Sequence, residues 1–199
     1  MTMRFRLADD GWCDDVVRMP SPNCDARPAA IAVDLLVIHN ISLPPGQFGG
    51  SFIADLFGNR LDCDAHPYFE QLRGLRVSAH FLIRRNGEVV QFVSTGERAW
   101  HAGVSLFRGR ERCNDFSIGI ELEGCDSAHF DDAQYAVLAD LTRALQARHP
   151  LADVAGHEHI APGRKTDPGP YFDWERYRKS LISHAALQRM PLNLRFPQD

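Results

Sequence analysis

Three side chains with the chemistry of metal ligands stand at the end of an apolar run and in one glycine- and proline-rich loop. His39 lies near the end of "VDLLVIHN" (33–40). His157 and Asp167 lie in "GHEHIAPGRKTDPGP" (156–170), whose three prolines and three glycines predict an irregular loop. Catalytic zinc takes three such nitrogen or oxygen ligands and keeps one position open for water. The spacing alone leaves two interpretations open, a zinc site or three ordinary polar residues.

A second histidine in the same loop, His159, is a weaker candidate. If the backbone is extended here, His159 points to the opposite face from His157 and is not a ligand. The pattern "HEHIA" also differs from the helical zinc-protease motif, because residue 161 is alanine rather than histidine. We therefore keep His157 as the ligand of this pair.

Strands must carry these residues to one place. The continuous apolar run 33–40 is typical of a buried strand that delivers His39 at its tip. Two apolar runs around Asn-Gly predict a β-hairpin over 78–93. In the predicted strand 116–124, Glu121 and Glu123 lie on the face opposite the isoleucines, and Glu123 is the better candidate for an ordinary surface glutamate.

Helices are predicted after the last of these strands. An amphipathic pattern begins at Asp131, where Gln134 completes a capping-box-like pair, and ends before Pro150. A short strand over 153–157 and a helix over 173–188 follow. A hairpin followed by alternating strands and helices predicts an α/β fold, with a central mixed β-sheet flanked by helices.

Size and composition restrict the class of protein. The 199 residues suit a single domain, 1–199, with irregular segments over about 1–30 and 185–199. A net charge of −4 predicts no nucleic-acid partner, and no apolar run is long enough for a membrane span. The start has no signal-peptide pattern, and five cysteines without a CxxC pair are typical of reduced thiols. We expect a cytoplasmic monomer.

Longer motifs add a resemblance to a known family. The stretches that carry it, in order along the chain, are "LLVIHNISLPPGQFGG", "HPYF", "VSAHFLIRRNGEVVQFV", "RAWHAGVS", "RERCNDFSIGIELEG" and "GHEHIAPGRKTDPGPYFDW". Over roughly residues 12–178 the chain resembles the zinc-dependent N-acetylmuramyl-L-alanine amidases, most closely the cytoplasmic AmpD type that acts on 1,6-anhydro-muropeptides. The resemblance implies a small muropeptide substrate, one zinc ion per chain, and a peptidoglycan-recognition-like sheet flanked by helices.

The resemblance also implies roles for individual residues. His39, His157 and Asp167 take the zinc positions, Glu121 that of the general base and Lys165 that of the oxyanion stabiliser. Five residues are candidates for the substrate walls or for holding stem-peptide carboxylates: Asn40, Arg76, Trp100, His101 and Arg112.

Alternatives remain within and outside this family. His159 and Gly163 depart from its pattern, and the C-terminal "ALQRMPLNLRFPQD" has no counterpart in it. A bacteriolytic amidase shares the chemistry but needs export. A peptidoglycan-recognition module without activity lacks a metal ligand, whereas all three candidates are present here. A zinc hydrolase with an unrelated substrate is disfavoured by the length of the matching motifs.

Overall fold

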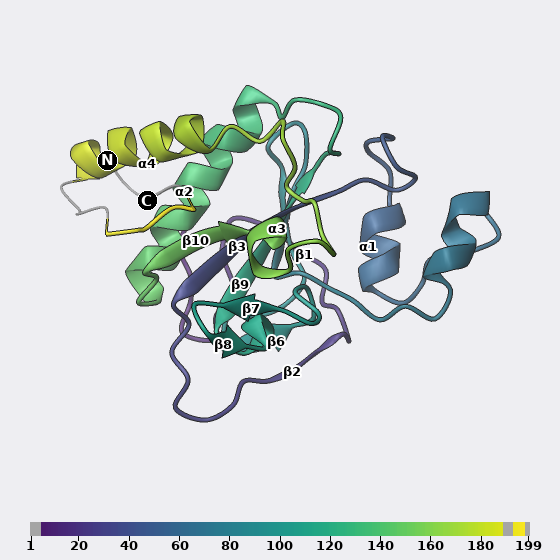
Figure 1. Ribbon diagram of the computed structural model, residues 1–199, viewed down its shortest axis with the longest axis horizontal. Coiled ribbons are helices and arrows are strands. Elements are labelled where there is room, and N and C mark those ends of the chain that lie inside the picture. The colour runs from purple at the N-terminus through teal and green to yellow at the C-terminus, as the bar shows by residue number, and fades with distance from the viewer. Residues whose placement is uncertain (1–4, 189–192, 198–199) are drawn as a thin grey trace.

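A six-stranded mixed sheet forms the centre of the molecule (Figure 1). Its strands follow the order β1-β5-β4-β9-β3-β10. The computed structural model describes residues 5–188 and 193–197, the side chains of 184–188 excepted. The strands are β1 (Val17–Arg18), β2 (Cys24–Ala26), β3 (Leu35–Ile41), β4 (Phe81–Ile83), β5 (Val89–Gln91), β6 (Glu97–Ala99), β7 (Leu106–Phe107), β8 (Arg110–Glu111), β9 (Ser117–Glu123) and β10 (Asp153–Gly156). The helices are α1 (Phe52–Phe57), α2 (Asp132–Arg148), α3 (His157–Ile160) and α4 (Trp174–Gln188), with 3-10 turns η1 (Pro67–Leu72) and η2 (Cys113–Asp115).

The middle of the sheet is parallel. Strand β3 pairs in parallel with β9 on one side and with β10 on the other, and β4 pairs in parallel with β9. A strand covered on both faces reads as a continuous apolar run, which is why 33–40 predicted β3 correctly. Because these strands run the same way, their carboxyl ends meet at one edge of the sheet.

The predicted hairpin is confirmed, and so is the start of the first long helix. Strands β4 and β5 pair antiparallel, and Gly87 in the turn between them has a φ of 81°, which favours glycine. At the start of α2, the backbone N–H of Asp131 donates to the side chain of Gln134 at 3.0 Å, one half of the predicted capping box.

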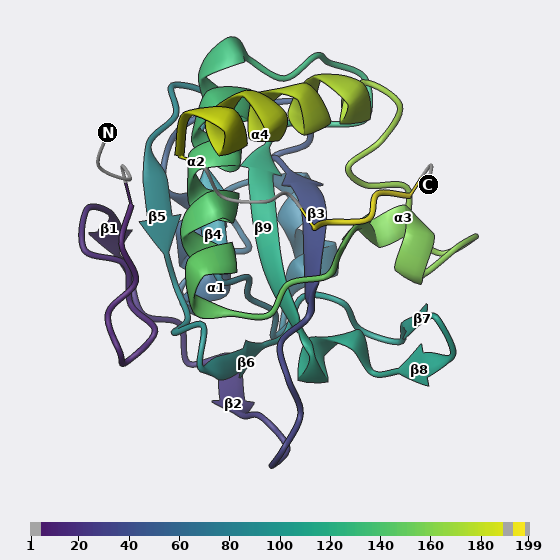
Figure 2. The same ribbon diagram turned by 90° about the vertical axis from the view of Figure 1, so that its left-hand side faces the viewer.

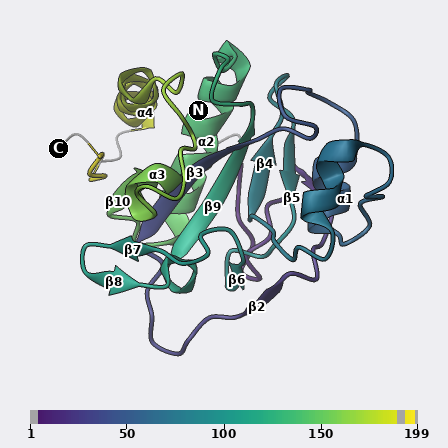
Figure 3. The same cartoon turned by 45° about the vertical axis from the view of Figure 1, so that its right-hand side comes forward.

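Helices cover both faces of the sheet. Figure 2 shows α2 and α4 in front of the sheet, and Figure 3 shows α1 on the opposite side. The larger apolar core packs α2 and α4 against the isoleucines of β9, and a second core packs α1 and η1 against β4 and β5. None of the described helices has the length and apolar character needed to cross a bilayer.

One local expectation was wrong. His157 does not lie in an extended strand, because β10 ends at Gly156 and His157 begins the short helix α3. His159 nevertheless turns away from His157, since its Nδ1 accepts a hydrogen bond from the backbone N–H of Gly156 at 2.9 Å. The turn is closed by the backbone N–H of Ala161, which donates to the carbonyl of His157 at 2.9 Å.

The predicted irregular tail, 185–199, is ordered where the structure describes it; residues 189–192 and 198–199 lie outside the described residues. Helix α4 continues to Gln188, and Arg195 then pairs with the free edge of β10. The N–H of Arg195 donates to Ala152 O and its carbonyl accepts from Val154 N, both at 2.9 Å. Its guanidinium forms an ion pair with Asp153. This pairing covers an edge that would otherwise expose unpaired backbone groups.

A substitution at Phe196 can show whether the described C-terminal residues, 193–197, are part of the folded core. Its ring is 4% exposed and lies 5.7 Å from that of Tyr177. We expect Phe196→Ala to lower the free energy of unfolding, measured in urea, by about 3 kcal/mol, because it leaves a cavity. Val104→Ala, at a side chain that is 86% exposed, is the control and should change little. A loss below about 0.5 kcal/mol in Phe196→Ala would show that the segment contributes nothing.

Candidate metal centre

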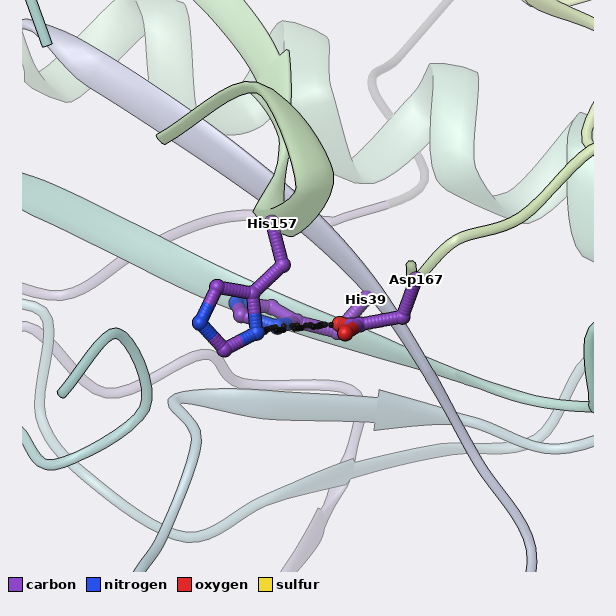
Figure 4. A group of neighbouring side chains, drawn as sticks. All are labelled: His39, His157 and Asp167. Atoms are coloured by element: carbon purple, nitrogen blue, oxygen red, sulfur yellow. Dashed lines mark hydrogen bonds and ion pairs between the residues drawn. The ribbon is translucent and has the colours of Figure 1, made fainter. Parts of the chain in front are cut away.

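The centre lies at the carboxyl ends of β3, β9 and β10. The strand register sets His39 of β3 beside Glu121 of β9, so the two side chains share a face. On the other side of β3, Ile38 is paired with Gly156, which brings the next residue, His157, beside His39. The loop after α3 then returns Asp167 to the same point (Figure 4). Carboxyl ends of parallel strands are the usual position of binding sites in such sheets.

The ligand atoms of the three residues converge. Nδ1 of His39 lies 2.9 Å from Oδ2 of Asp167, and Nδ1 of His157 lies 3.1 Å from the same oxygen. The two Nδ1 atoms are 3.1 Å apart. Three ligands about 2.0–2.1 Å from a tetrahedral zinc ion are separated from one another by ~3.3 Å. The three donors therefore fit such an ion with little movement.

The outer nitrogen of the His157 imidazole explains why its inner nitrogen is free to bind. Nε2 of His157 lies 3.1 Å from the carbonyl oxygen of Ala102. A carbonyl only accepts, so this Nε2 carries the hydrogen and Nδ1 presents a lone pair to Asp167. Burial lowers the pKa of His39 to about 4, which keeps its imidazole neutral near pH 7. A lone pair that faces a carboxylate with no hydrogen between them is repelled unless a cation lies there, so this arrangement suits a bound cation.

Glu121 lies beside the ligands without being one of them. Its side chain is 8% exposed, and its Oε2 has no hydrogen-bond partner among the described residues. Burial raises the pKa of Glu121 well above its usual value; the Asp167 carboxylate raises it further and the Lys165 ammonium lowers it. A bound divalent cation would act in the same direction as Lys165. A carboxylate in this position is able to exchange a proton with a molecule in the cavity.

The other glutamate of β9 has a different environment from the one expected. Glu123 was interpreted as a surface residue, and this is wrong, because its side chain is 2% exposed. Its Oε1 lies 3.1 Å from Nη1 of Arg84 and accepts from the backbone N–H of Gly49 at 2.7 Å. These contacts satisfy its charge and leave Glu121 as the free carboxylate on this strand.

A cavity of about 520 Å³ opens above the centre. The three ligands line it together with Glu121 and Lys165. Lys165 is exposed on the loop between α3 and Asp167, which places a positive charge at the open side of the cavity. Arg164 anchors this loop, because its Nη2 donates to the carbonyl of Ala102 at 2.9 Å.

Asp126 is a site residue that the sequence analysis missed. Its Oδ1 accepts from Nδ2 of Asn40 at 2.6 Å, and its other oxygen accepts from the hydroxyl of Thr166. Nδ2 of Asn40 also donates to the carbonyl of Pro168 at 3.0 Å. Asn40 lines the cavity as expected, but its amide holds the loop that carries Asp167. The sequence did offer a signal for Asp126, because an acidic residue that closely follows a predicted strand is a candidate site residue.

The four other predicted substrate residues are dispersed. Arg76, Trp100 and Arg112 are not among the described residues that line the central cavity. Arg76 borders a neighbouring hollow of about 130 Å³, and Arg112 one of about 620 Å³. His101 lines the central cavity, but its Nδ1 lies 2.9 Å from Nε2 of His39. Substrate binding by these residues stays a prediction.

Comparisons with known proteins find similarity to a family of enzymes. The Amidase_2 family, described as N-acetylmuramoyl-L-alanine amidase, matches residues 29–170. The chain is 59% identical over 182 residues to the 1,6-anhydro-N-acetylmuramyl-L-alanine amidase AmpD of Salmonella typhimurium SL1344, across 89% of this chain and 97% of that protein.

Two solved structures of amidases superpose on this chain. A crystal structure of a selenomethionine AmpD derivative superposes with a TM-score of 0.86 at 58% identity, over 88% of this chain and 99% of the other. The amidase AmiD of E. coli, in complex with the substrate anhydro-N-acetylmuramic acid-L-Ala-D-gamma-Glu-L-Lys, superposes with a TM-score of 0.54 at 32% identity. That match covers 87% of this chain and 65% of AmiD.

Proposed function

The chain belongs to the N-acetylmuramoyl-L-alanine amidase family, and we propose that it is a zinc-dependent hydrolase of soluble 1,6-anhydro-muropeptides. The bond it cleaves is the amide between the lactyl group of N-acetylmuramic acid and L-alanine. One observation carries the proposal. Two imidazole nitrogens and a carboxylate oxygen converge in a cavity that also holds a buried glutamate oxygen with no hydrogen-bond partner among the described residues.

The roles of the residues follow from their positions. His39, His157 and Asp167 would hold one zinc ion, which supplies a Lewis acid able to polarise the amide carbonyl and acidify a water molecule. Glu121 takes the proton of the attacking water on its free oxygen and returns it to the departing amine of L-alanine. Lys165 offers its ammonium to the negative charge that develops on the carbonyl oxygen.

The substrate class rests on the relatives. The Salmonella typhimurium relative is named for the 1,6-anhydro-muramyl amide, and AmiD was solved with an anhydro-muramyl peptide. A cavity of about 520 Å³ falls in the range of roughly 300–1,000 Å³ typical of small-molecule sites. We place the enzyme in cytoplasmic cell-wall recycling and expect it to act as a monomer.

Metal content and substrate preference test this function together. We expect gently purified protein to contain one zinc ion per chain, because one set of three ligands is present in the described part of the chain. Mass spectrometry should find anhydro-N-acetylmuramic acid and free stem peptide after incubation with a soluble anhydro-muropeptide. Intact sacculi should react much more slowly.

Two outcomes would contradict the proposal in different ways. Protein without zinc, whose activity is not recovered by adding zinc, would exclude the metal mechanism. Comparable rates on sacculi and on soluble anhydro-muropeptide would favour the bacteriolytic alternative.

A further inference from the structure

Two neighbouring residues, His101 and Ala102, contact the outer nitrogens of both histidine ligands. The carbonyl of Ala102 faces Nε2 of His157 at 3.1 Å, and Nδ1 of His101 faces Nε2 of His39 at 2.9 Å. We propose that His101 is a positioning residue that fixes the tautomer and ring orientation of His39, so that its Nδ1 is available to the metal.

A chain of hydrogen bonds with a fixed direction carries this inference. The hydroxyl of Ser117 donates to the carbonyl of Cys113 at 2.6 Å, which uses its single hydrogen. Its oxygen is therefore the acceptor for Nε2 of His101 at 3.2 Å, and that nitrogen carries the hydrogen of the neutral ring. Nδ1 of His101 is then an acceptor, so Nε2 of His39 must donate to it. The remaining nitrogen of His39, Nδ1, has a free lone pair and points at Asp167.

The surroundings of His101 are shaped to hold the ring in this position. Gly119 of β9 leaves the space, because a Cβ atom there would lie 2.5 Å from Cγ and 2.6 Å from Nδ1 of His101. The side-chain oxygen of Asn114 accepts from the backbone N–H groups of His101 and Ala102, at 3.2 and 2.8 Å. Both outer contacts are thus set by one short segment tied to η2.

Zinc affinity distinguishes a positioning role of His101 from a role in binding substrate. Loss of the outer hydrogen bond of a metal-bound histidine typically lowers metal affinity by roughly 10- to 100-fold. A residue of the substrate wall, the role expected from the sequence, would change KM and leave zinc binding unaltered. The inference rests on the proposed zinc site, so zinc affinity is the quantity to measure.

The experiment compares zinc dissociation constants of metal-free variants, measured by competition with a chromophoric chelator. His101→Phe keeps a ring of similar size and removes the acceptor for His39, and we expect a loss of roughly 10- to 100-fold. Gly119→Ala should give a similar loss with all ligands and His101 present, because the new Cβ displaces the imidazole. His101→Asn offers Oδ1 as an acceptor in place of Nδ1 and should recover most of the affinity.

A matched control removes another partly buried histidine. Nε2 of His149 lies 2.9 Å from the hydroxyl of Thr95, and His149 does not line the cavity, so His149→Phe should keep the affinity of the parent protein. Thermal unfolding of the metal-free variants monitors the fold. His101→Phe with unchanged zinc affinity and raised KM would overturn the inference in favour of the substrate wall. Equal losses in all four variants would overturn it in favour of a general effect on folding. No zinc binding by the parent protein would instead contradict the proposed function.

Discussion

Asp167→Ala should lose its zinc and its amidase activity together. The carboxylate is the one anionic member of the ligand set, and the two imidazoles that remain are neutral ligands. We expect zinc affinity and kcat/KM both to fall by more than the roughly 100-fold typical of removing an outer contact. Chelator competition and turnover of anhydro-muropeptide measure the two quantities on the same preparation.

The change should leave the fold intact, because the loop is held by backbone and other side chains. The carbonyl of Asp167 accepts from the N–H of Glu158 at 2.9 Å, and alanine keeps that bond. Asp167→Asn is the matched variant, since it preserves shape while removing the charge. Retention of zinc at parental affinity in both variants would show that Asp167 is not a ligand.

Glu121→Gln should separate catalysis from metal binding. Glutamine has the size of glutamate but is not a base, and Glu121 contributes no atom to the ligand set. We expect the variant to keep its zinc and its thermal stability while kcat falls by something on the order of 100- to 10,000-fold, as for general acid–base groups. Zinc analysis, thermal unfolding and steady-state kinetics together test this combination.

Lys165→Ala is the comparison variant for this experiment. Lys165→Ala should also keep zinc and lose rate, by roughly 100- to 1,000-fold, typical of an oxyanion donor. Loss of metal from either variant, as complete as in Asp167→Ala, would make that residue a ligand. Near-normal turnover in Glu121→Gln would move the base elsewhere, and Glu158 is the next residue to change.

Local patterns were sufficient for most of the secondary structure. The apolar run 33–40 predicted the buried strand β3, and Asn86-Gly87 predicted the β4–β5 turn. The pair of Asp131 and Gln134 predicted the start of α2 within one residue. Each of these features depends on neighbours within a few positions of the chain, where propensity and side-chain periodicity act directly.

The sequence by itself also determined which residues could form the site. His39, His157, Asp167, Glu121 and Lys165 were selected through residue type, loop composition and family resemblance. Their types define the chemistry available, two imidazoles with a carboxylate for a metal, and a second carboxylate and an ammonium beside it.

Tertiary structure alone decided the contacts of these side chains. His39 lies next to His157 across 118 positions, and next to His101 across 62, because β3 is placed between β9 and β10. No local pattern specifies that strand order. For the same reason, the sequence could not reveal that Arg84 forms an ion pair with Glu123, while one oxygen of Glu121 has no hydrogen-bond partner in the described part of the chain. Partner choice in a buried site depends on which strands become neighbours, and only the packed sheet determines that.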